Sequence, residues 1–513
     1  MRYRNPVIRG MNADPSVARR GEDYYLATSS FGTIPGLPIY HSRDLVNWRL
    51  AGHALPEGIA GQSRVNIFAP TLRYARDRFY LVSTDVRGLG NFVTNAPEPE
   101  GPWSPPVAID EDGFDPSLCF AADGTVYYTR RGRIVDRDIV QAEIDPDTGR
   151  LLTPTRPVAL GFVSDDAEGP HLYQIGGAWY LCLAEGGSRQ LHMQTVARAP
   201  GPWGPFEVCP HNPFLAQHHA WWNELLGAGH AELFEAHDGS WWAAFLATRH
   251  PSYDALSHIG RETFLAPVIW RDGWPEVPPG ALHSLEVAGP TPPRRPWPAP
   301  PARDDFDTPG LGGAWVTLGR LTEDEVSLSA RPGHLRLGHG PAWDRLEPGG
   351  AVPTFVGRRQ EDLECTATAA LELGQGDQAG EAGLAVYLTA EYHYEIVARR
   401  DGAGTEVFLR RSVGDCAVAG EPVRLPGHTA VMRVAADADR YRFEVEESPG
   451  SWRAVGTGLT RLVSSELAAT WNGVMLGMWS AGDGGGWVAD FDWFEYRGYD
   501  APPDSNFDGE EER

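Results

Sequence analysis

Four ionisable residues stand at matching places in four segments of the chain. Each lies ten to twelve residues before a pair of adjacent aromatic residues, and a fifth segment has Ala69 at this place. Matching offsets predict matching positions in a repeated fold, so these side chains should converge on one cavity. Three of them are acids, and like charges in one cavity disfavour a purely structural role. The four residues are Asp14, Asp115, Glu168 and His230.

Three carboxyl groups in one cavity suit the hydrolysis of glycosidic bonds. That reaction needs a protonated carboxyl for the leaving oxygen and an ionised carboxylate that activates water or attacks carbon. A third acid can raise the pKa of the proton donor. Taken singly, each residue has an ordinary explanation, because Asp-Pro-Ser is a common turn, Glu168 is one of several loop acids and a single histidine is more often a core residue. The shared offset favours the catalytic interpretation.

The aromatic pairs themselves recur at intervals of 48 to 62 residues. Each lies in a short apolar run after a turn, which predicts the second strand of a hairpin. A strand-based period of about 50 residues is typical of a β-propeller with four strands per blade, so five repeats predict five blades. The alternative is a β-sandwich with coincidental aromatics. The pairs are Tyr24-Tyr25, Phe79-Tyr80, Tyr127-Tyr128, Trp179-Tyr180 and Trp241-Trp242.

A proline-dense stretch divides the chain. The run PTPPRRPWPAPP excludes helix and central strand and predicts a stiff spacer. We therefore predict an all-β protein with a five-bladed β-propeller over 1–289, a linker over 290–303 and an antiparallel, concanavalin-like jelly-roll sandwich over 304–499. The acidic residues 500–513 are expected to form a disordered tail.

Charge and cysteine content narrow the partners and the location. The formal net charge of -25 disfavours binding to nucleic acid and to anionic membranes. The N-terminus has no apolar secretion signal, and no run of about 18 apolar residues suggests a membrane span. The five cysteines are scattered without CxxC or zinc spacing, which fits reduced thiols. These features predict a cytoplasmic protein.

Four motifs carry a resemblance to a known family. In chain order they are NPVIRGMNADPSV, FDPSLCF, AEGPHLY and GHAELFEAHDGSWW. Together they resemble glycoside hydrolase family 43, in its β-xylosidase and α-L-arabinofuranosidase branch, from Asn5 to about Pro278. The second domain, with AVYLTAEYHYEI and ADFDWFEY, is similar to the β-sandwich appended to these enzymes.

The resemblance implies an inverting mechanism with assigned roles for the acids. Asp14 would be the general base that activates water, and Glu168 would be the general acid. Asp115 would raise the pKa of the acid and position it. No cofactor is required in such enzymes.

The resemblance also implies a set of substrate-binding residues. His230 would lie near the pocket floor, where it faces a hydrated calcium ion in some relatives. Arg261 would bind sugar hydroxyls, although a strand-end arginine paired to an acid is an equal alternative. Phe31 and Phe68 would wall the sugar pocket, with core packing as the alternative. Trp471 would help to close the pocket from the second domain.

Some positions depart from the family pattern. Phe68 stands where many relatives have Trp, Thr71 where others have Asp, Asn66 where Gly is frequent, and Cys119 where a bulkier residue is found. The acidic trio is intact, so these departures bear on the shape of the sugar pocket. The choice between xylose and arabinose stays open.

The expected function is an exo-acting glycosidase that removes terminal pentose units from short xylo-oligosaccharides or arabinose side units. One alternative is an endo-arabinanase, which needs an open groove. Another is a carbohydrate-binding propeller without catalysis, against which the acidic trio argues. A phosphorylase would need a basic phosphate site in place of one acid. The expected partner is an oligosaccharide, with a possible homo-oligomer and a possible Ca2+ at the propeller channel.

Overall fold

The structure is a computed structural model that describes residues 2–502 except 110–111, 134–137, 218–222, 253–255, 290, 344–352, 375–378, 403 and 483–485. Almost all regular structure in this part is β, with two short 3-10 helices, η1 (Pro279–Leu282) and η3 (Thr460–Val463). None of the helices described is long and apolar enough to cross a membrane. Most of the predicted acidic tail, 503–513, lies outside the described residues.

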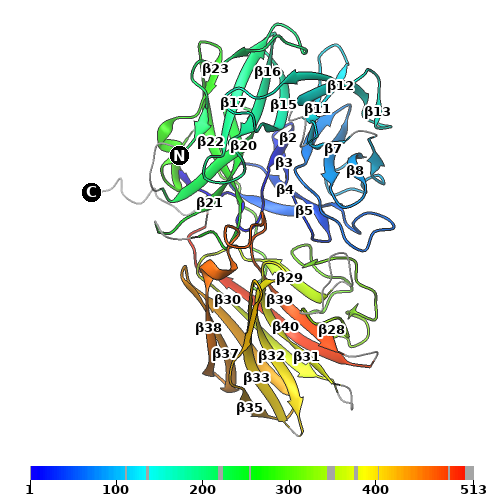
Figure 1. The fold of residues 1–513 in the computed structure, drawn as a ribbon, viewed down its shortest axis with the longest axis vertical. Coiled ribbons are helices and arrows are strands. Elements are labelled where there is room, and N and C mark those ends of the chain that lie inside the picture. The colour runs from blue at the N-terminus through cyan, green and yellow to red at the C-terminus, as the bar shows by residue number, and fades with distance from the viewer. Residues whose placement is uncertain are drawn as a thin grey trace, which may run out of the picture. The chain divides into compact units, whose positions relative to one another are not determined.

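The chain divides into two compact units. Unit 1 is built on Met1–Tyr253 and Arg261–Trp297, and unit 2 on Asp254–Gly260 and Pro298–Ala501. Unit 1 contains five antiparallel sheets whose strands follow one another in chain order (Figure 1). Each sheet is one blade of a propeller, as the five repeats predicted.

The first strands of neighbouring blades contact one another around the ring, so the first strand of each blade is the innermost. In blades 3 and 4 a fifth short strand pairs beside the third. The strands are β2 (Ser16–Arg20), β3 (Asp23–Ala27), β4 (Gly36–Ser42) and β5 (Trp48–Leu55) in blade 1; β6 (Thr71–Ala75), β7 (Arg78–Asp85), β8 (Gly90–Ala96) and β9 (Val107–Ala108) in blade 2; β10 (Phe114–Phe120), β11 (Val126–Arg131), β12 (Ile139–Asp145), β13 (Arg150–Leu151) and β14 (Arg156–Ala159) in blade 3; β15 (Glu168–Ile175), β16 (Ala178–Glu185), β17 (Met193–Ala199), β18 (Glu207–Val208) and β19 (Leu215–Ala216) in blade 4; β20 (Leu225–Glu235), β21 (Trp241–Arg249), β22 (Glu262–Arg271) and β23 (Trp274–Glu276) in blade 5.

The five aromatic pairs lie in the second strand of each blade, which confirms the hairpin interpretation. One ring of a pair packs toward a neighbouring blade. Tyr25 of β3 meets Phe79 of β7 edge to face, with ring centroids 5.0 Å apart, and Tyr127 of β11 meets Trp179 of β16 at 5.3 Å. The apolar core therefore lies between adjacent blades, where each sheet buries both faces.

The N-terminal segment closes the ring. Strand β1 (Arg2–Arg4) pairs with β24 (Glu286–Ala288), at the other end of the propeller sequence. The side chain of Asn5 donates to the Leu265 carbonyl at 2.9 Å and accepts from the Leu265 amide at 3.0 Å. This closure fixes blade 1 against blade 5, and so brings residues near position 14 to residues near position 230.

Unit 2 is a two-sheet antiparallel sandwich with one apolar core between the sheets. The predicted antiparallel, concanavalin-like sandwich is confirmed. One sheet contains β25 (Arg303–Asp304), β27 (Val326–Ser327), β28 (Leu335–Gly338), β30 (Cys365–Leu373), β36 (Thr429–Ala436), β37 (Arg440–Ser448), β38 (Ser451–Leu459) and β40 (Val488–Gly498), and the other contains β26 (Val316–Thr317), β29 (Thr354–Arg359), β31 (Gly380–Tyr387), β32 (Tyr392–Asp401), β33 (Gly404–Val413), β34 (Cys416–Ala419), β35 (Val423–Pro426) and β39 (Met475–Gly482).

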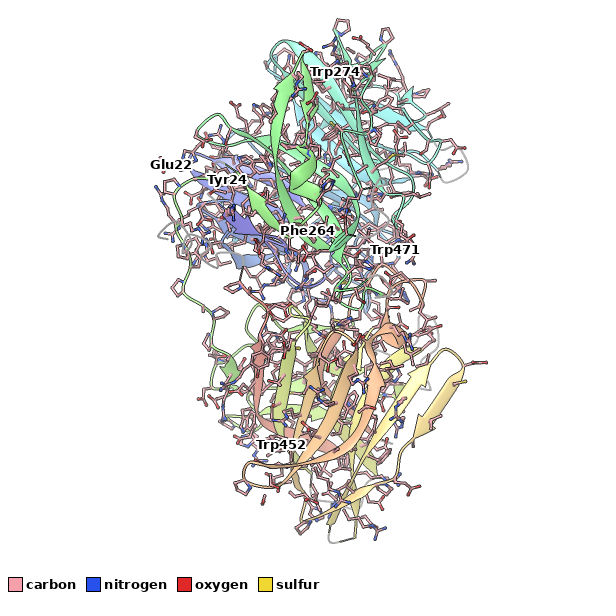
Figure 2. The ribbon with its side chains drawn as sticks, turned by 90° about the vertical axis from the view of Figure 1, so that its left-hand side faces the viewer. Glu22, Tyr24, Phe264, Trp274, Trp452 and Trp471 are labelled. Atoms are coloured by element: carbon pink, nitrogen blue, oxygen red, sulfur yellow. The ribbon has the colours of Figure 1, made fainter. Side chains whose placement is uncertain are left out.

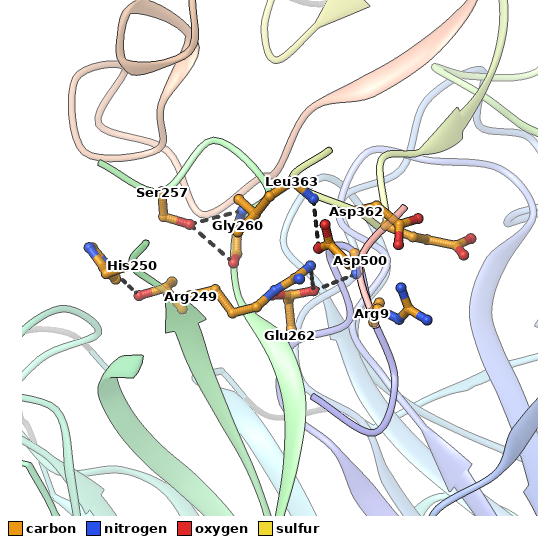
Figure 3. A network of polar contacts seen from close by, with 12 residues as sticks. Arg9, Arg249, His250, Ser257, Gly260, Glu262, Asp362, Leu363 and Asp500 are labelled. Atoms are coloured by element: carbon orange, nitrogen blue, oxygen red, sulfur yellow. Dashed lines mark hydrogen bonds and ion pairs between the residues drawn. The ribbon is translucent and has the colours of Figure 1, made fainter. Parts of the chain in front are cut away.

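A short segment from within the propeller sequence belongs to unit 2. The Ser257 amide donates to both oxygens of Glu466 at 3.1 Å, and the Val474 amide donates to the His258 carbonyl at 2.8 Å. Ser257 and Gly260 exchange two further hydrogen bonds (Figure 3). The unit boundary thus differs from the expected 1–289, because these backbone groups find their partners in the sandwich.

Part of the proline-rich stretch packs on blade 1. The Trp297 ring lies between the guanidinium groups of Arg43 and Arg49, at 3.8 and 4.0 Å from its centroid. The Arg295 amide donates to Asp44 Oδ2 at 2.6 Å. Residues up to Trp297 therefore belong to unit 1, although the sequence suggests a stiff spacer over 290–303. At the other end of unit 2, Asp500 accepts from the Leu363 amide at 2.9 Å (Figure 3).

Candidate active site

Left-handed backbone positions near the innermost strands present the predicted site residues. Asp14, Asp115 and His230 have φ values of 56°, 52° and 46°, and Gly169, beside Glu168, has 53°. The pairing register of β10, β15 and β20 with the next strand shifts at these places. Such irregularities re-aim side chains, and the left-handed conformation costs energy that functional sites commonly carry. The shared offset in the sequence therefore marks a shared backbone feature.

Asp14 is buried among groups that keep it ionised. Its side chain accepts a short hydrogen bond from Ser29 Oγ, and its Oδ1 lies 3.2 Å from His230 Nδ1 and 3.7 Å from Arg261 Nη1. Burial alone would raise the pKa of Asp14, but Arg261 and His230 outweigh it and hold this pKa well below its usual value. An ionised carboxylate can accept a proton from water, as a general base must.

Asp115 and Glu168 have the opposite electrostatics. The pKa of Glu168 is raised to about 7, mainly because the side chain is buried and secondly because the charge of Asp115 is close. Burial, together with Asp14, raises the pKa of Asp115 to about 6 although His230 opposes the shift. Asp115 Oδ2 also accepts from the Gly169 amide at 3.2 Å, which ties it to the strand of Glu168. One member of this pair can hold a proton near neutral pH, as a general acid must.

His230 lies against Asp14, with its Nδ1 3.2 Å from Asp14 Oδ1. Burial would lower its pKa, but its hydrogen bond to Asp14 and the charges of the three acids raise the pKa to about 9. Its imidazolium therefore offsets part of the negative charge of the site, and its side chain is only 7% exposed. A Cβ atom on Gly169 would lie 2.5 Å from His230 Nε2, so only glycine fits there.

This close approach gives a testable prediction. We expect Gly169→Ala to lower kcat/KM at least about tenfold, because the added methyl group must displace His230 and misalign Asp14. The matched control is Gly176→Ala, since Gly176 also has a positive φ of 57° but no atom lies within 4 Å of the position that a methyl group would take there. Steady-state kinetics of both variants test the idea, and equal losses in the two would contradict it.

Phe31, Phe68 and Arg261 come together beside Asp14. The Phe31 and Phe68 rings meet edge to face at 5.9 Å, and the Arg261 guanidinium lies 5.7 Å from the Phe31 ring centroid. Phe31 has a φ of 48° and exchanges two 2.9 Å backbone hydrogen bonds with Ile67, so its position is fixed. An aromatic wall next to a fork of donors suits a sugar ring and its hydroxyls.

Arg261 lies near the acid Asp14 and also has one N–H donor, at Nε, that is not used in a hydrogen bond among the described residues. Its backbone carbonyl accepts from the Asn12 amide at 2.9 Å, and the next residue, Glu262, forms a buried ion pair with Arg249 at 2.6 Å (Figure 3). Among the described residues its buried Nε has no hydrogen-bond partner. Both interpretations of this arginine, acid pairing and sugar binding, are therefore compatible with the geometry.

Arg261→Met should have two separable effects. We expect KM to rise roughly tenfold because a hydroxyl partner is lost. We also expect the acidic limb of the pH-rate profile to move to higher pH, because Asp14 loses the charge that lowers its pKa most. Kinetics across pH measure both effects. An unchanged acidic limb would contradict the coupling of Arg261 to Asp14.

The structure also shows the surroundings of Glu185 and the exposure of Trp471. Glu185 accepts from the amides of Phe162, Val163 and Ser164 and from Thr195 Oγ1, so it holds the loop before Glu168, in line with a structural role. Trp471 belongs to unit 2 and is 44% exposed (Figure 2). Its part in closing a pocket stays a prediction.

Comparison with known proteins assigns the family. Residues 3–275 match glycosyl hydrolases family 43, and residues 303–497 match the β-xylosidase C-terminal concanavalin A-like domain. The chain belongs to glycosyl hydrolase family 43. This family 43 protein is therefore a glycoside hydrolase, and the resemblance seen in the four sequence motifs is confirmed.

Relatives of this family 43 hydrolase are similar over their whole length. The non-reducing end α-L-arabinofuranosidase BoGH43B of Bacteroides ovatus is 38% identical over 508 residues, covering 96% of this chain and 94% of that protein. A xylan 1,3-β-xylosidase of a Vibrio species is 34% identical, covering 96% and 98%. The solved Bacteroides ovatus xyloglucan PUL GH43B superposes with a TM-score of 0.91 at 36% identity, covering 97% and 100% of the two chains. A xylan β-1,4-xylosidase of Bacillus halodurans gives 0.88 at 30%, covering 96% and 99%.

Sequence reasoning missed several residues of the hydrolase site. Ser29 bonds to Asp14 from 15 residues away, and nothing in its sequence surroundings marks it. Gly169 lies within the motif AEGPHLY, and a glycine directly after the acid at this offset could have signalled a close approach. His192 is buried near the site, where burial first, then the charges of His230 and Arg261, lowers its pKa to about 3.

Among the described residues, the side chains around His230 do not form a protein ligand set for the calcium ion that the resemblance implies. Ca2+ takes six to eight oxygen ligands. Within the described ranges no group of three or more His, Cys, Asp or Glu side chains is arranged to hold a metal. Glu232, two residues after His230, uses both carboxylate oxygens in bonds to Tyr173, Ser16 and Arg73.

Proposed function

We propose that this hydrolase is an inverting, exo-acting pentosidase. It removes terminal xylose from short xylo-oligosaccharides, terminal arabinofuranose from side units, or both. Asp14 is the general base that activates water, Glu168 is the general acid, and Asp115 keeps Glu168 protonated. His230, Arg261, Phe31 and Phe68 hold the sugar.

One observation carries the assignment. The environment separates the acids, since Asp14 is held ionised while the pKa of Glu168 is raised to about 7. A base and an acid with separated pKa values are what glycoside hydrolysis needs. In a purely sugar-binding propeller, a buried carboxyl with a raised pKa would only weaken folding, which argues against the non-catalytic alternative.

The raised pKa of Glu168 predicts the shape of the pH profile. Glu168 must be protonated to act, so kcat/KM should fall as pH rises through about 7. Asp115→Asn removes the charge that, after burial, raises this pKa most, and should move the alkaline limb to lower pH. Asp166→Asn is the control. The charge of Asp166 also raises the pKa of Glu168, but less than the charge of Asp115 does, and its side chain is half exposed. An equal shift in both variants would contradict the role of Asp115.

The choice of pentoses rests on the names of the relatives, which include α-L-arabinofuranosidases and β-xylosidases. The test is release of the aryl group from aryl β-D-xyloside and aryl α-L-arabinofuranoside, with Asp14→Ala alongside. We expect release from at least one substrate by the wild type and none by the variant. Cleavage of long arabinan without release from either aryl glycoside would instead identify an endo-arabinanase.

The remaining proposals concern the cellular location, the partners and the oligomeric state of the enzyme. We propose a cytoplasmic location, where short imported oligosaccharides are the substrates, supported by five cysteines without disulfides. Neither nucleic acid nor membrane is proposed as a partner, because the net charge is -25. A homo-oligomer is compatible with this function, and no cofactor takes part in the proposed steps.

A further inference from the structure

Blade 2 contributes no acid to the site, but it contributes an arginine to the propeller axis. At the place of the other site residues it has Ala69, and four residues later Arg73 points inward from β6. The Arg73 guanidinium lies against Glu232 of blade 5, with Nη1 3.0 Å from Oε2. Glu232 is 2% exposed and Arg73 is 16% exposed, so the pair is largely withdrawn from solvent.

The contacts of Arg73 reach the strands that carry three site residues. Its Nη1 lies 3.4 Å from Ser16 Oγ, two residues after Asp14. Its Nε donates to the Leu118 carbonyl at 2.9 Å, three residues after Asp115. Its partner Glu232 lies two residues after His230 in β20. One side chain thus links blades 1, 3 and 5 directly beyond their site residues.

The network around this pair is closed and balanced in charge. Glu232 accepts from Ser16 Oγ at 2.8 Å and from Tyr173 Oη at 3.0 Å, in addition to Arg73. Burial would raise the pKa of Glu232, but the charge and hydrogen bond of Arg73 outweigh it and lower this pKa. Burial lowers the pKa of His171 to about 4, so this neighbour is neutral at working pH. The network therefore pairs one guanidinium with one carboxylate, and both oxygens of that carboxylate already accept hydrogen bonds.

We propose that the Arg73 guanidinium is a built-in cation at the propeller axis and takes the place of a divalent metal there. In this role Arg73 positions the strands that carry Asp14, Asp115 and His230. The proposal deepens the proposed function and rests on it for the catalytic readout. A planar guanidinium with several fixed donors can join three strands, as a coordinated ion would, without depending on metal supply. Arg73 is a positioning residue, since its bonds are to other side chains and backbone.

The first arm of the test uses the wild-type protein and Ca2+ alone. Activity and the thermal unfolding midpoint are measured after exhaustive treatment with a chelator and again with millimolar CaCl2. We expect both to be unchanged. Loss of activity or a lower midpoint after chelation, with recovery in Ca2+, would overturn the proposal. The unfolding midpoint reports metal binding even if no pentoside is cleaved, so this arm separates the proposal from a failure of the proposed function.

The second arm uses Arg73→Met, Arg73→Lys and a control, Arg271→Met, which removes an exposed arginine that lies 3.6 Å from Glu276. We expect Arg73→Met to lower kcat at least about tenfold with little change in KM, because the acids are misaligned while the sugar contacts remain. Arg73→Lys should recover part of the loss, since it keeps the charge but not the fork. Wild-type kcat in Arg73→Met would overturn the proposal. If that variant does not fold, wild-type kcat in Arg73→Lys would overturn it instead.

Discussion

Asp14→Asn is expected to lower kcat by roughly 10³–10⁴-fold on whichever aryl pentoside the wild type cleaves. The asparagine keeps the size of the side chain and can still bond to Ser29, but it cannot accept a proton from water. The loss should be the same for good and poor leaving groups, because the attack of water is impaired in both. Steady-state kinetics on a series of aryl glycosides measure it.

A suitable control for this variant is Asp23→Asn in the same blade. Asp23 pairs with His41 at 2.7 Å and is 43% exposed, so it is not one of the buried acids of the site. Its kcat should stay close to wild type. If Asp14→Asn retains more than about a tenth of the wild-type kcat, Asp14 is not the general base.

Glu168→Gln is expected to show a loss that depends on the leaving group. Unactivated oligosaccharides need a proton on the departing oxygen, so their hydrolysis should fall by roughly 10³-fold or more. Aryl glycosides with acidic phenols leave without that help and should lose far less. The alkaline limb of the pH profile near 7 should also disappear, because the group that titrates there has been removed.

Glu185→Gln separates this effect from a general disturbance of the loop. Glu185 is fully buried and holds the backbone at residues 162–164 before the acid. Its variant should reduce stability and should affect all leaving groups alike. Equal losses across leaving groups in Glu168→Gln would contradict its role as proton donor.

The sequence was informative where the fold repeats. The aromatic pairs mark the second strand of every blade because each must fill the space between two sheets, and this need recurs five times. The offset from those pairs to Asp14, Asp115 and His230 was informative for the same reason, since the left-handed positions recur with the blades.

The sequence was less informative about contacts between residues of different blades or of different units. Ser29 and Arg73 act through partners on other strands or blades, and no local pattern identifies those partners. Ser257 falls within the predicted propeller range 1–289, yet its backbone amide bonds to Glu466 of the sandwich. The proline-rich stretch is predicted to be a stiff spacer, yet the Trp297 ring stacks with two arginines of blade 1. Such pairings depend on closure of the ring and on packing over long sequence separations.

The most direct test of the central claim is the stereochemical course of hydrolysis, followed by proton NMR from the first minutes of the reaction. With an aryl β-D-xyloside or α-L-arabinofuranoside as substrate, we expect the first sugar formed to have the opposite anomeric configuration, because Asp14 activates water and Glu168 protonates the leaving group in one step. A first product that retains the configuration would make Asp14 a nucleophile and contradict the account. Release of no pentose from either substrate would contradict the proposed activity itself.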